Sequence, residues 1–332
     1  MIVLEGERGA PPPTGARCGC GKRAVTFIRY SGAHLCGDCL RASVESRVRR
    51  EMRQQTAMKP GTKLAVALSG GKDSLAALRL VHGLVAKRKG VELFAITVDE
   101  GIQGYRSASV EAAARVCGEL SVDHRVVKME HEQRITVDAI AKARPERAPC
   151  SYCGVFRRRL ANAEARQWGA DYLATGHNLD DVAQSILMSF VRADLGKLAR
   201  MAPHEKRQSE LVPRILPLRM VPEKEVFLYA LLSGLPIQGE QCPHMGRAAR
   251  GPIKEMLLAL EDATPGTRHA IVGAFERLRP ALRETLAREA QERPIGLCPR
   301  CGEPSAAGVC QACLMIEEFE APRPASISVR DA

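Results

Sequence analysis

The sequence predicts an α/β protein in which helices cover a parallel β-sheet and a zinc-binding module flanks the sheet domain at each end. From Lys63 onward, short apolar runs alternate with segments whose apolar residues recur at helical spacing. Strands that alternate with helices form a parallel sheet. A glycine-rich stretch separates the first strand from its helix, and a compact group of four cysteines lies near each end of the chain.

The predicted elements follow one another in the order that such a sheet requires. The strands are the apolar runs "KLAVAL" (63–68), "VELFAITV" (91–98), "VDHRVVKM" (122–129) and "DYLATG" (171–176). The helices between and after them are expected at residues 72–89, 107–120, 130–143, 154–169, 180–192, 222–233 and, as a pair, 252–290. A basic helix is expected at 41–58, before the first strand, and a polar loop at 198–210.

Composition narrows the class of protein. The chain has 332 residues, of which 45% are hydrophobic and only 4% aromatic, so its core is large and aliphatic. A formal charge of +11 indicates a polyanionic partner, most commonly a nucleic acid. We find no signal-peptide pattern and no stretch of about 20 apolar residues. We therefore expect a cytoplasmic protein without membrane contact, in which the 12 cysteines favour metal binding over disulfides.

The stretch "SGGKDS" between the first strand and its helix has the composition of a phosphate-binding loop. Its members are Ser69, Gly70, Gly71, Lys72, Asp73 and Ser74. Glycines allow backbone N–H groups to approach an anion closely, and the following helix N-terminus adds partial positive charge. Lys72 adds a full charge, and Asp73 can recruit Mg²⁺. Because Asp73 separates the lysine from the serine, the loop is not a Walker motif.

This loop is similar to the PP-loop of the N-type ATP pyrophosphatases. Those enzymes cleave ATP between its α and β phosphates and adenylate an acceptor oxygen. The resemblance implies an adenine nucleotide alpha hydrolase-like domain with five parallel strands and the nucleotide at their carboxyl ends, which agrees with the general rule for such sheets. It also implies that the backbone at Ala67, Val98 and Gly176 meets adenosine.

Three further cysteines lie in the central part of the chain. Cys150 and Cys153 form a CxxC pair in "PCSYCG", and Cys242 follows in "QCPH". A lone CxxC fits a redox pair, half of a zinc site or part of an iron–sulfur cluster. Three thiolates are one short of a closed cage, and a cluster held by three thiolates leaves one iron open. Persulfide and disulfide chemistry without a metal is the alternative, since a thiolate of low pKa could perform it.

The PP-loop, "CSYCG", "TGHNLDD", the later "CP" and the terminal cysteine groups occur together in one order over residues 18–315. This combination resembles the tRNA 2-thiouridine synthetases of the TtuA type, within the TtcA-like PP-loop superfamily. The resemblance implies that AMP is transferred to the C2 oxygen of a uridine and that sulfur then replaces this oxygen. It implies a [4Fe-4S] cluster on Cys150, Cys153 and Cys242 whose free iron carries sulfide. A ubiquitin-like thiocarboxylated sulfur carrier, tRNA and a second copy of the chain are the implied partners. The family modifies uridines at the wobble position and in the T-loop.

The terminal cysteine groups have the spacing of structural zinc sites. The C-terminal ligands are Cys298, Cys301, Cys310 and Cys313, and the N-terminal ligands are Cys18, Cys20, Cys36 and Cys39. Closed four-thiolate sites stabilise small folds and leave no position open for catalysis. We therefore expect two Zn²⁺ ions that serve folding and RNA docking. The first N-terminal pair is spaced CxC instead of CxxC, and His34 is an alternative ligand there.

Two aspartates and one arginine complete the predicted site. Asp180 and Asp181 follow the strand 171–176, at the edge where a nucleotide would lie. One of them is expected to cap the next helix. The resemblance implies that Asp181 is the catalytic candidate, as Mg²⁺ ligand or proton acceptor. It implies that Asp180 belongs to the nucleotide-binding residues. Arg157, one helical turn after Cys153, matches a position where relatives carry positive charge, which suits clamping a phosphate.

These expectations divide the chain into six segments. They are a disordered start (1–17), an N-terminal zinc finger with a basic linker helix (18–58), the PP-loop ATPase domain (59–240), a helical extension carrying the third cluster cysteine (241–293), a C-terminal zinc ribbon (294–317) and a disordered tail (318–332). Other functions remain open from the residues alone. They are a thiolase that uses persulfide chemistry, a PP-loop ligase for a small molecule, and a non-catalytic RNA-binding zinc protein.

Overall fold

The computed structural model of the chain describes residues 15–204, 210–237, 239–244, 251–289, 295–305 and 307–320. The disorder expected for the chain start falls almost wholly on residues 1–14, and that of the tail on 321–332, both outside the described residues. The polar loop expected at 198–210 is described only in part, because residues 205–209 lie outside as well.

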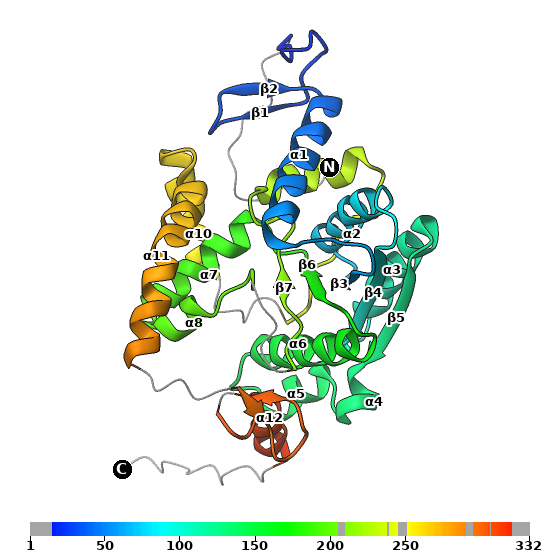
Figure 1. Cartoon of the computed structure of the whole chain (residues 1–332), viewed down its shortest axis with the longest axis vertical. Coiled ribbons are helices and arrows are strands. Elements are labelled where there is room, and N and C mark those ends of the chain that lie inside the picture. The colour runs from blue at the N-terminus through cyan, green and yellow to red at the C-terminus, as the bar shows by residue number, and fades with distance from the viewer. Residues whose placement is uncertain are drawn as a thin grey trace, which may run out of the picture.

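A five-stranded parallel sheet forms the centre of the molecule (Figure 1), as the sequence predicts. Its strands are β3 (Lys63–Leu68), β4 (Glu92–Asp99), β5 (Asp123–Lys128), β6 (Tyr172–Thr175) and β7 (Arg214–Ile215), in the spatial order β5-β4-β3-β6-β7. Sequence analysis located the first four. It missed β7 because two paired residues between Pro213 and Pro217 leave no strand pattern to detect.

Helices cover the sheet in two layers, and a third group of helices extends beyond its β6–β7 edge. One face carries α2 (Lys72–Val85) and α3 (Arg106–Leu120), backed by α1 (Gly37–Gln55) and α9 (Glu223–Leu232). The other face carries α4 (Met129–Gln133), α5 (Val137–Ala143), α6 (Pro149–Gln167) and α12 (Gln311–Glu320). The third group consists of α7 (Leu179–Val191), α8 (Leu195–Ala199), α10 (Gly251–Ala263) and α11 (Thr267–Glu289), which share a separate apolar cluster.

The strand order determines where a ligand can bind. The chain runs from β3 outward through β4 and β5, and then returns to β6 on the opposite side of β3. Ligands bind at the carboxyl ends of such a sheet, where the order reverses. The loop 69–74 follows β3 and the segment "GHNLDD" follows β6, so both lie at this point.

A small cysteine-bearing module lies at each end of the molecule (Figure 1). The N-terminal one pairs β1 (Thr26–Ile28) with β2 (Ala33–Leu35), and Cys36 caps the start of α1. The C-terminal one pairs β8 (Gly296–Leu297) with β9 (Pro304–Ser305) and continues into α12, which packs on α6.

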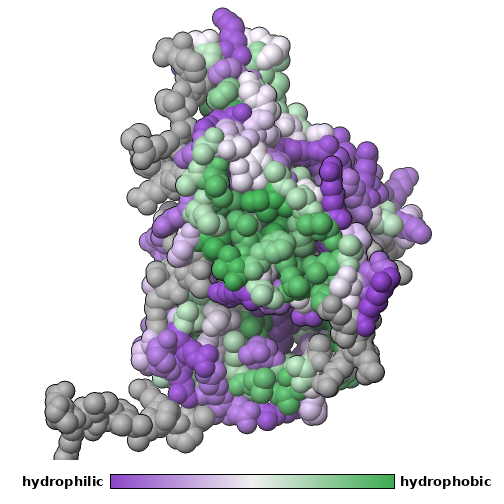
Figure 2. Space-filling model, turned by 90° about the vertical axis from the view of Figure 1, so that its left-hand side faces the viewer, coloured by the Kyte–Doolittle hydropathy of each residue, from purple (hydrophilic) through white to green (hydrophobic). Residues whose placement is uncertain are grey.

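Apolar residues gather on the face that is seen when the molecule is turned to bring the α10–α11 side forward (Figure 2). Exposed large side chains of this helical layer include Met256 and Leu260 of α10 and Leu278 of α11, which is 58% exposed. Among the described helices, none combines the length and the apolar character that crossing a membrane would require.

Candidate nucleotide and thiol site

The loop after β3 is folded around its two serines. The backbone N–H of Ser69 donates to Ser74 Oγ over 3.1 Å, and that hydroxyl donates to the carbonyl of Gly71 over 2.9 Å. Helix α2 begins directly afterwards at Lys72, with Gly71 as an N-cap that provides no side-chain hydrogen bond. The first N–H groups of a helix without such a cap attract anions, so the loop and helix fit a phosphate group.

Two glycines are required by the close packing of this loop. Gly70 has a φ of 79°, and a Cβ there would lie 2.0 Å from the carbonyl oxygen of Ser109 in α3. Gly176 follows β6, and a Cβ there would lie 2.8 Å from the Cα of Ser74. The predicted nucleotide-binding backbone at Gly176 is therefore held directly against the PP-loop.

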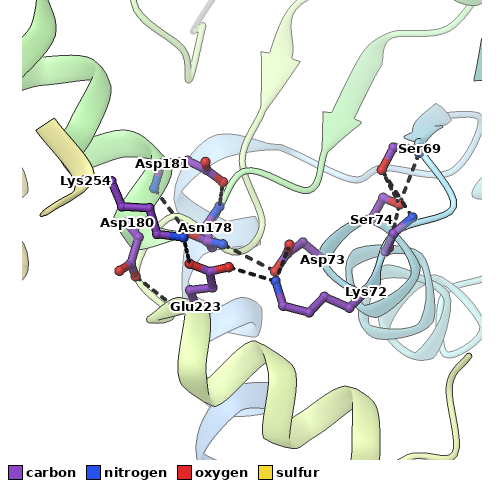
Figure 3. A network of polar contacts seen from close by, with 10 residues as sticks. Ser69, Lys72, Asp73, Ser74, Asn178, Asp180, Asp181, Glu223 and Lys254 are labelled. Atoms are coloured by element: carbon purple, nitrogen blue, oxygen red, sulfur yellow. Dashed lines mark hydrogen bonds and ion pairs between the residues drawn. The ribbon is translucent and has the colours of Figure 1, made fainter. Parts of the chain in front are cut away.

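A network of charged side chains extends from the loop to α9 and α10 (Figure 3). Lys72 Nζ lies 2.9 Å from Asp73 Oδ2 and 3.0 Å from Glu223 Oε1, and Glu223 Oε2 lies 3.4 Å from Lys254 Nζ. Burial disfavours the charge on Lys72, but the two carboxylates outweigh it and raise the lysine's pKa. Burial likewise opposes ionisation of Glu223, yet the two lysines lower its pKa. Lys72 is therefore fully cationic and shared between two carboxylates.

Asp73 has the properties of a cation ligand. Burial, with smaller contributions from Asp181 and Glu223, raises its pKa despite the neighbouring lysine. Its other oxygen accepts a hydrogen bond from Asn178 Nδ2 over 3.3 Å (Figure 3). Burial disfavours the ionised form of such a carboxyl group, and a bound divalent cation stabilises that form. Asp73 is therefore suited to bind the expected Mg²⁺.

Asp180 and Asp181 both make contacts that stabilise the fold. Asp181 forms a capping box with Asn178 at the start of α7, as expected for one of the pair. Asp180 is 5% exposed, pairs with Arg268 of α11 and accepts a hydrogen bond from the backbone N–H of Glu223 over 2.8 Å. Asp180 therefore acts on the loop only through Glu223.

The backbone positions expected to meet adenosine lie at the same edge of the sheet. Ala67 is the last but one residue of β3, and Val98 holds the same position in β4. The carbonyl oxygen of Val98 already accepts a hydrogen bond from Arg106 at the start of α3.

The three central cysteines converge from two segments. Helix α6 begins at Pro149, which places Cys150 and Cys153 on its first turns. The segment 239–244 brings Cys242 near them, so that Cys150 and Cys242 both help to raise the pKa of Cys153, and Cys150 helps to raise that of Cys242. Cys150 Sγ donates to the carbonyl of His244 over 3.6 Å, and Cys153 Sγ lies 3.9 Å from Glu100 Oε1. The structure therefore brings the predicted trio to one region near the carboxyl end of β4, and among the described residues only the two terminal cysteine groups have all their sulfur atoms within 4.8 Å of one another.

Burial disfavours the thiolate form of two of these cysteines. Burial is the main cause that raises the pKa of Cys153 to about 11, and it also raises the pKa of Cys242. A metal ligand and a persulfide-forming nucleophile both act as the thiolate, so either use requires a nearby positive group or ion that stabilises the charge. Three thiols without a fourth are the donor set of a cluster with one open iron.

Arg157 lies near this trio, as the sequence predicts. Its Nη1 is 3.5 Å from Glu100 Oε1, and 48% of its side chain is exposed. The guanidinium therefore reaches the solvent side of the thiol site, where an incoming anion would arrive.

The terminal cysteine groups lie at opposite ends of the molecule (Figure 1), and the C-terminal one continues into α12, which packs on the helix α6 that carries Cys150 and Cys153. In each group the four sulfur atoms lie within 4.8 Å of one another, so each fits a single metal ion. The CxC spacing of Cys18 and Cys20 thus still allows a compact four-cysteine set. His34 is not part of that set and instead packs against the ring of Phe27.

Four residues at the site escaped the sequence analysis. Glu100 and Arg106 connect the loop with the thiols, while Glu223 and Lys254 surround Lys72. Glu100 directly follows β4 in "VDEG", and this position at a strand's carboxyl end was a usable signal. The others come from helices whose packing no local pattern reveals.

Comparisons with known proteins agree with this geometry. Residues 44–237 match the family described as "PP-loop domain", and residues 17–41 match "2-thiouridine synthetase TtuA, N-terminal LIM domain". The tRNA 2-thiolation protein NcsA of Haloferax volcanii is 43% identical over 91% of this chain and 98% of its own length. Cytoplasmic tRNA 2-thiolation protein 1 of Bos taurus is 36% identical over 95% of this chain and 90% of its own.

A solved structure gives the same picture. The U34-tRNA thiolase NcsA of Methanococcus maripaludis, with its [4Fe-4S] cluster, superimposes with a TM-score of 0.71 and 34% identity. The match covers 80% of this chain and 88% of that one. The chain therefore belongs to the PP-loop family of tRNA 2-thiolation proteins.

Proposed function

We propose that this protein is an ATP-dependent tRNA sulfurtransferase that converts a uridine to 2-thiouridine. One observation carries the proposal: the PP-loop and the three cysteines open at the same edge of one sheet. Ser69 of the loop is connected to Cys153 through Arg106 and Glu100 over successive contacts of 2.5, 2.6 and 3.9 Å. The U34 specificity of the M. maripaludis protein supports the wobble uridine as the substrate.

The first half of the reaction takes place at the PP-loop. The uridine C2 oxygen attacks the α-phosphorus of ATP, a phosphorus–oxygen bond forms, and the bond to the departing pyrophosphate breaks. Lys72 and the N–H groups at the start of α2 stabilise the charge that develops on the leaving group. Asp73 holds the Mg²⁺ that neutralises the phosphates, and Asp181, at the start of α7, supplies a second oxygen ligand or accepts a proton.

The second half takes place between the loop and the cysteines. A carbon–sulfur bond forms at C2, the carbon–oxygen bond breaks, and AMP leaves with the former uridine oxygen. A [4Fe-4S] cluster held by Cys150, Cys153 and Cys242 would supply the sulfur from its open iron. Arg157 stabilises the anionic sulfur source and the departing AMP as a fixed positive charge.

The tRNA is expected to bind through its phosphates. Arg49, Arg50 and Arg53, in the C-terminal half of α1, line an exposed hollow of about 340 Å³. Arg47 of the same helix is excluded, because its side chain is 12% exposed and pairs with Glu225. The polar loop expected at 198–210 adds Lys206 and Arg207 to the basic residues of the chain, and both lie outside the described residues. Zn²⁺ in both cysteine groups would keep these modules folded.

The remaining assignments are part of the same proposal. They are a thiocarboxylated ubiquitin-like carrier as sulfur donor, a cytoplasmic location, the six-segment division and a homodimer. The exposed apolar side chains of α10 and α11 support the last of these, because a large uncovered apolar patch commonly marks a contact between chains.

The test is reconstitution under anaerobic conditions. The purified protein, with iron and zinc content measured, is incubated with unmodified tRNA, ATP, Mg²⁺ and sulfide, and the digested nucleosides are analysed by mass spectrometry. We expect 2-thiouridine that forms only when ATP is present. A cluster-containing protein that yields no thiolated nucleoside would overturn the proposal.

A further inference from the structure

A buried ion pair joins the two halves of the site. Glu100 follows β4, and Arg106 begins α3. Their side chains are 3% and 5% exposed, and Arg106 Nε lies 2.6 Å from Glu100 Oε2. These two atoms are not aligned for a hydrogen bond, so the contact is electrostatic.

Arg106 uses its remaining nitrogens to hold the nucleotide side. Its Nη1 donates to the carbonyl oxygen of Ser69, the first residue of the PP-loop, over 2.5 Å. Its Nη2 donates to the carbonyl of Val98 at the end of β4. A planar guanidinium can satisfy two carbonyls and one carboxylate in different directions, which a lysine ammonium cannot do with the same rigidity.

Glu100 extends the same connection to the sulfur side. Its second oxygen, Oε1, lies 3.9 Å from Cys153 Sγ and 3.5 Å from Arg157 Nη1. The Glu100 carboxylate therefore contacts a predicted cluster cysteine and a predicted catalytic arginine, while Arg106 is hydrogen-bonded to the PP-loop. A buried ion pair of this kind specifies position, because any displacement of one group leaves the other charge unpaired.

We propose that Glu100 and Arg106 form a positioning pair that fixes the PP-loop and the three-cysteine site at one relative placement. The inference rests on the proposed function, in which AMP transfer and sulfur attack must meet at one uridine carbon. Neither residue is a ligand or a nucleophile. Their role is to hold the PP-loop and the three-cysteine site in a fixed position relative to each other.

The test uses cross-effects in the cluster-containing protein. Arg106→Lys should change the electron paramagnetic resonance spectrum of the reduced cluster, because Arg106 is linked to Cys153 through Glu100. Glu100→Gln should weaken ATP binding, measured by calorimetry, although Glu100 lies outside the loop. We expect each variant to raise the Kd for ATP about tenfold. The double variant should be no weaker than the worse single variant, because both changes break one unit.

The matched controls are Arg219→Lys and Glu51→Gln. Arg219 and Glu51 form another buried pair, at 2.5 Å and with 12% and 4% of the side chains exposed, and Arg219 also pairs with Glu276 of α11. These two control variants should lose as much thermal stability as the variants of Arg106 and Glu100. Their Kd for ATP should stay within about twofold of the native value, and the electron paramagnetic resonance spectrum of the cluster should be unchanged. Glu100→Gln keeps the shape and the hydrogen-bonding capacity of the side chain. If Arg106→Lys does not fold, the ATP affinity of Glu100→Gln alone tests the proposal.

Three results would overturn the pair's role: an unchanged ATP affinity in Glu100→Gln, equal effects in the controls, or strictly additive losses in the double variant. Neither readout requires tRNA or a thiolated product. A native protein that makes no 2-thiouridine would therefore refute the proposed function and still leave the positioning pair to be judged by its own data.

Discussion

The sharpest test of the loop geometry is the substitution Gly70→Ala. Gly70 has a φ of 79°, and its missing side chain points at the backbone of α3. An added Cβ would lie 2.0, 2.6 and 2.8 Å from the O, C and Cα atoms of Ser109. These are backbone atoms within a helix, so they cannot rotate away as a flexible side chain would.

The magnitude follows from two contributions. A left-handed conformation costs a residue with a Cβ roughly 1–2 kcal/mol, and overpacking against fixed atoms adds about 1–3 kcal/mol. Relief of the clash requires the loop to move by roughly 1.5 Å to reach ordinary contact distance. A displacement of this size at a reacting centre lowers kcat by about 100-fold.

The assay compares Gly70→Ala with Gly71→Ala, which makes the same chemical change one residue later. A Cβ at Gly71 meets its nearest atom, Ser69 Oγ, at 3.5 Å, and the φ there is −79°. Gly71→Ala should therefore change the free energy of unfolding by no more than about 1 kcal/mol. Thermal unfolding and tRNA-dependent AMP release are measured for both. Equal stability of the two variants, with normal AMP release by Gly70→Ala, would refute the packing argument.

Three further predictions address the charges and the thiols. Glu223→Gln should tighten ATP binding by about threefold or more, because the carboxylate 3.0 Å from Lys72 competes with phosphate for it; weaker binding by calorimetry would contradict this. Cys242→Ser should remove iron and thiolation while leaving ATP affinity within about twofold, and a variant that retains full iron and product would refute its ligand role. Affinity for tRNA should fall by at least about tenfold between low and moderate salt, whereas a flat titration, or an unchanged slope in Arg50→Ala, would argue against phosphate docking on α1.

The sequence was sufficient to predict those features that depend on residues close together in the chain. Strand–helix alternation located four of the five sheet strands, and the residues 69–74 identified the anion site because their function depends on neighbours in the chain. The two-residue strand β7 left no such pattern.

Long-range charge pairing was beyond the sequence for a physical reason. Lys72 and Glu223 are separated by 151 positions, and Arg47 and Glu225 by 178. Nothing near Arg47 distinguishes a residue that will be buried in an ion pair from an exposed neighbour such as Arg50. The partner of each charge is set by how α1, α2 and α9 pack, which only the folded structure shows.

The fate of one oxygen atom tests the central claim most directly. If the C2 oxygen of uridine is adenylated before sulfur replaces it, that oxygen must leave in AMP. With tRNA carrying oxygen-18 at C2 of the target uridine, mass spectrometry should find the label in AMP, in proportion to the 2-thiouridine formed. Label recovered in water or pyrophosphate, with unlabelled AMP, would contradict the account.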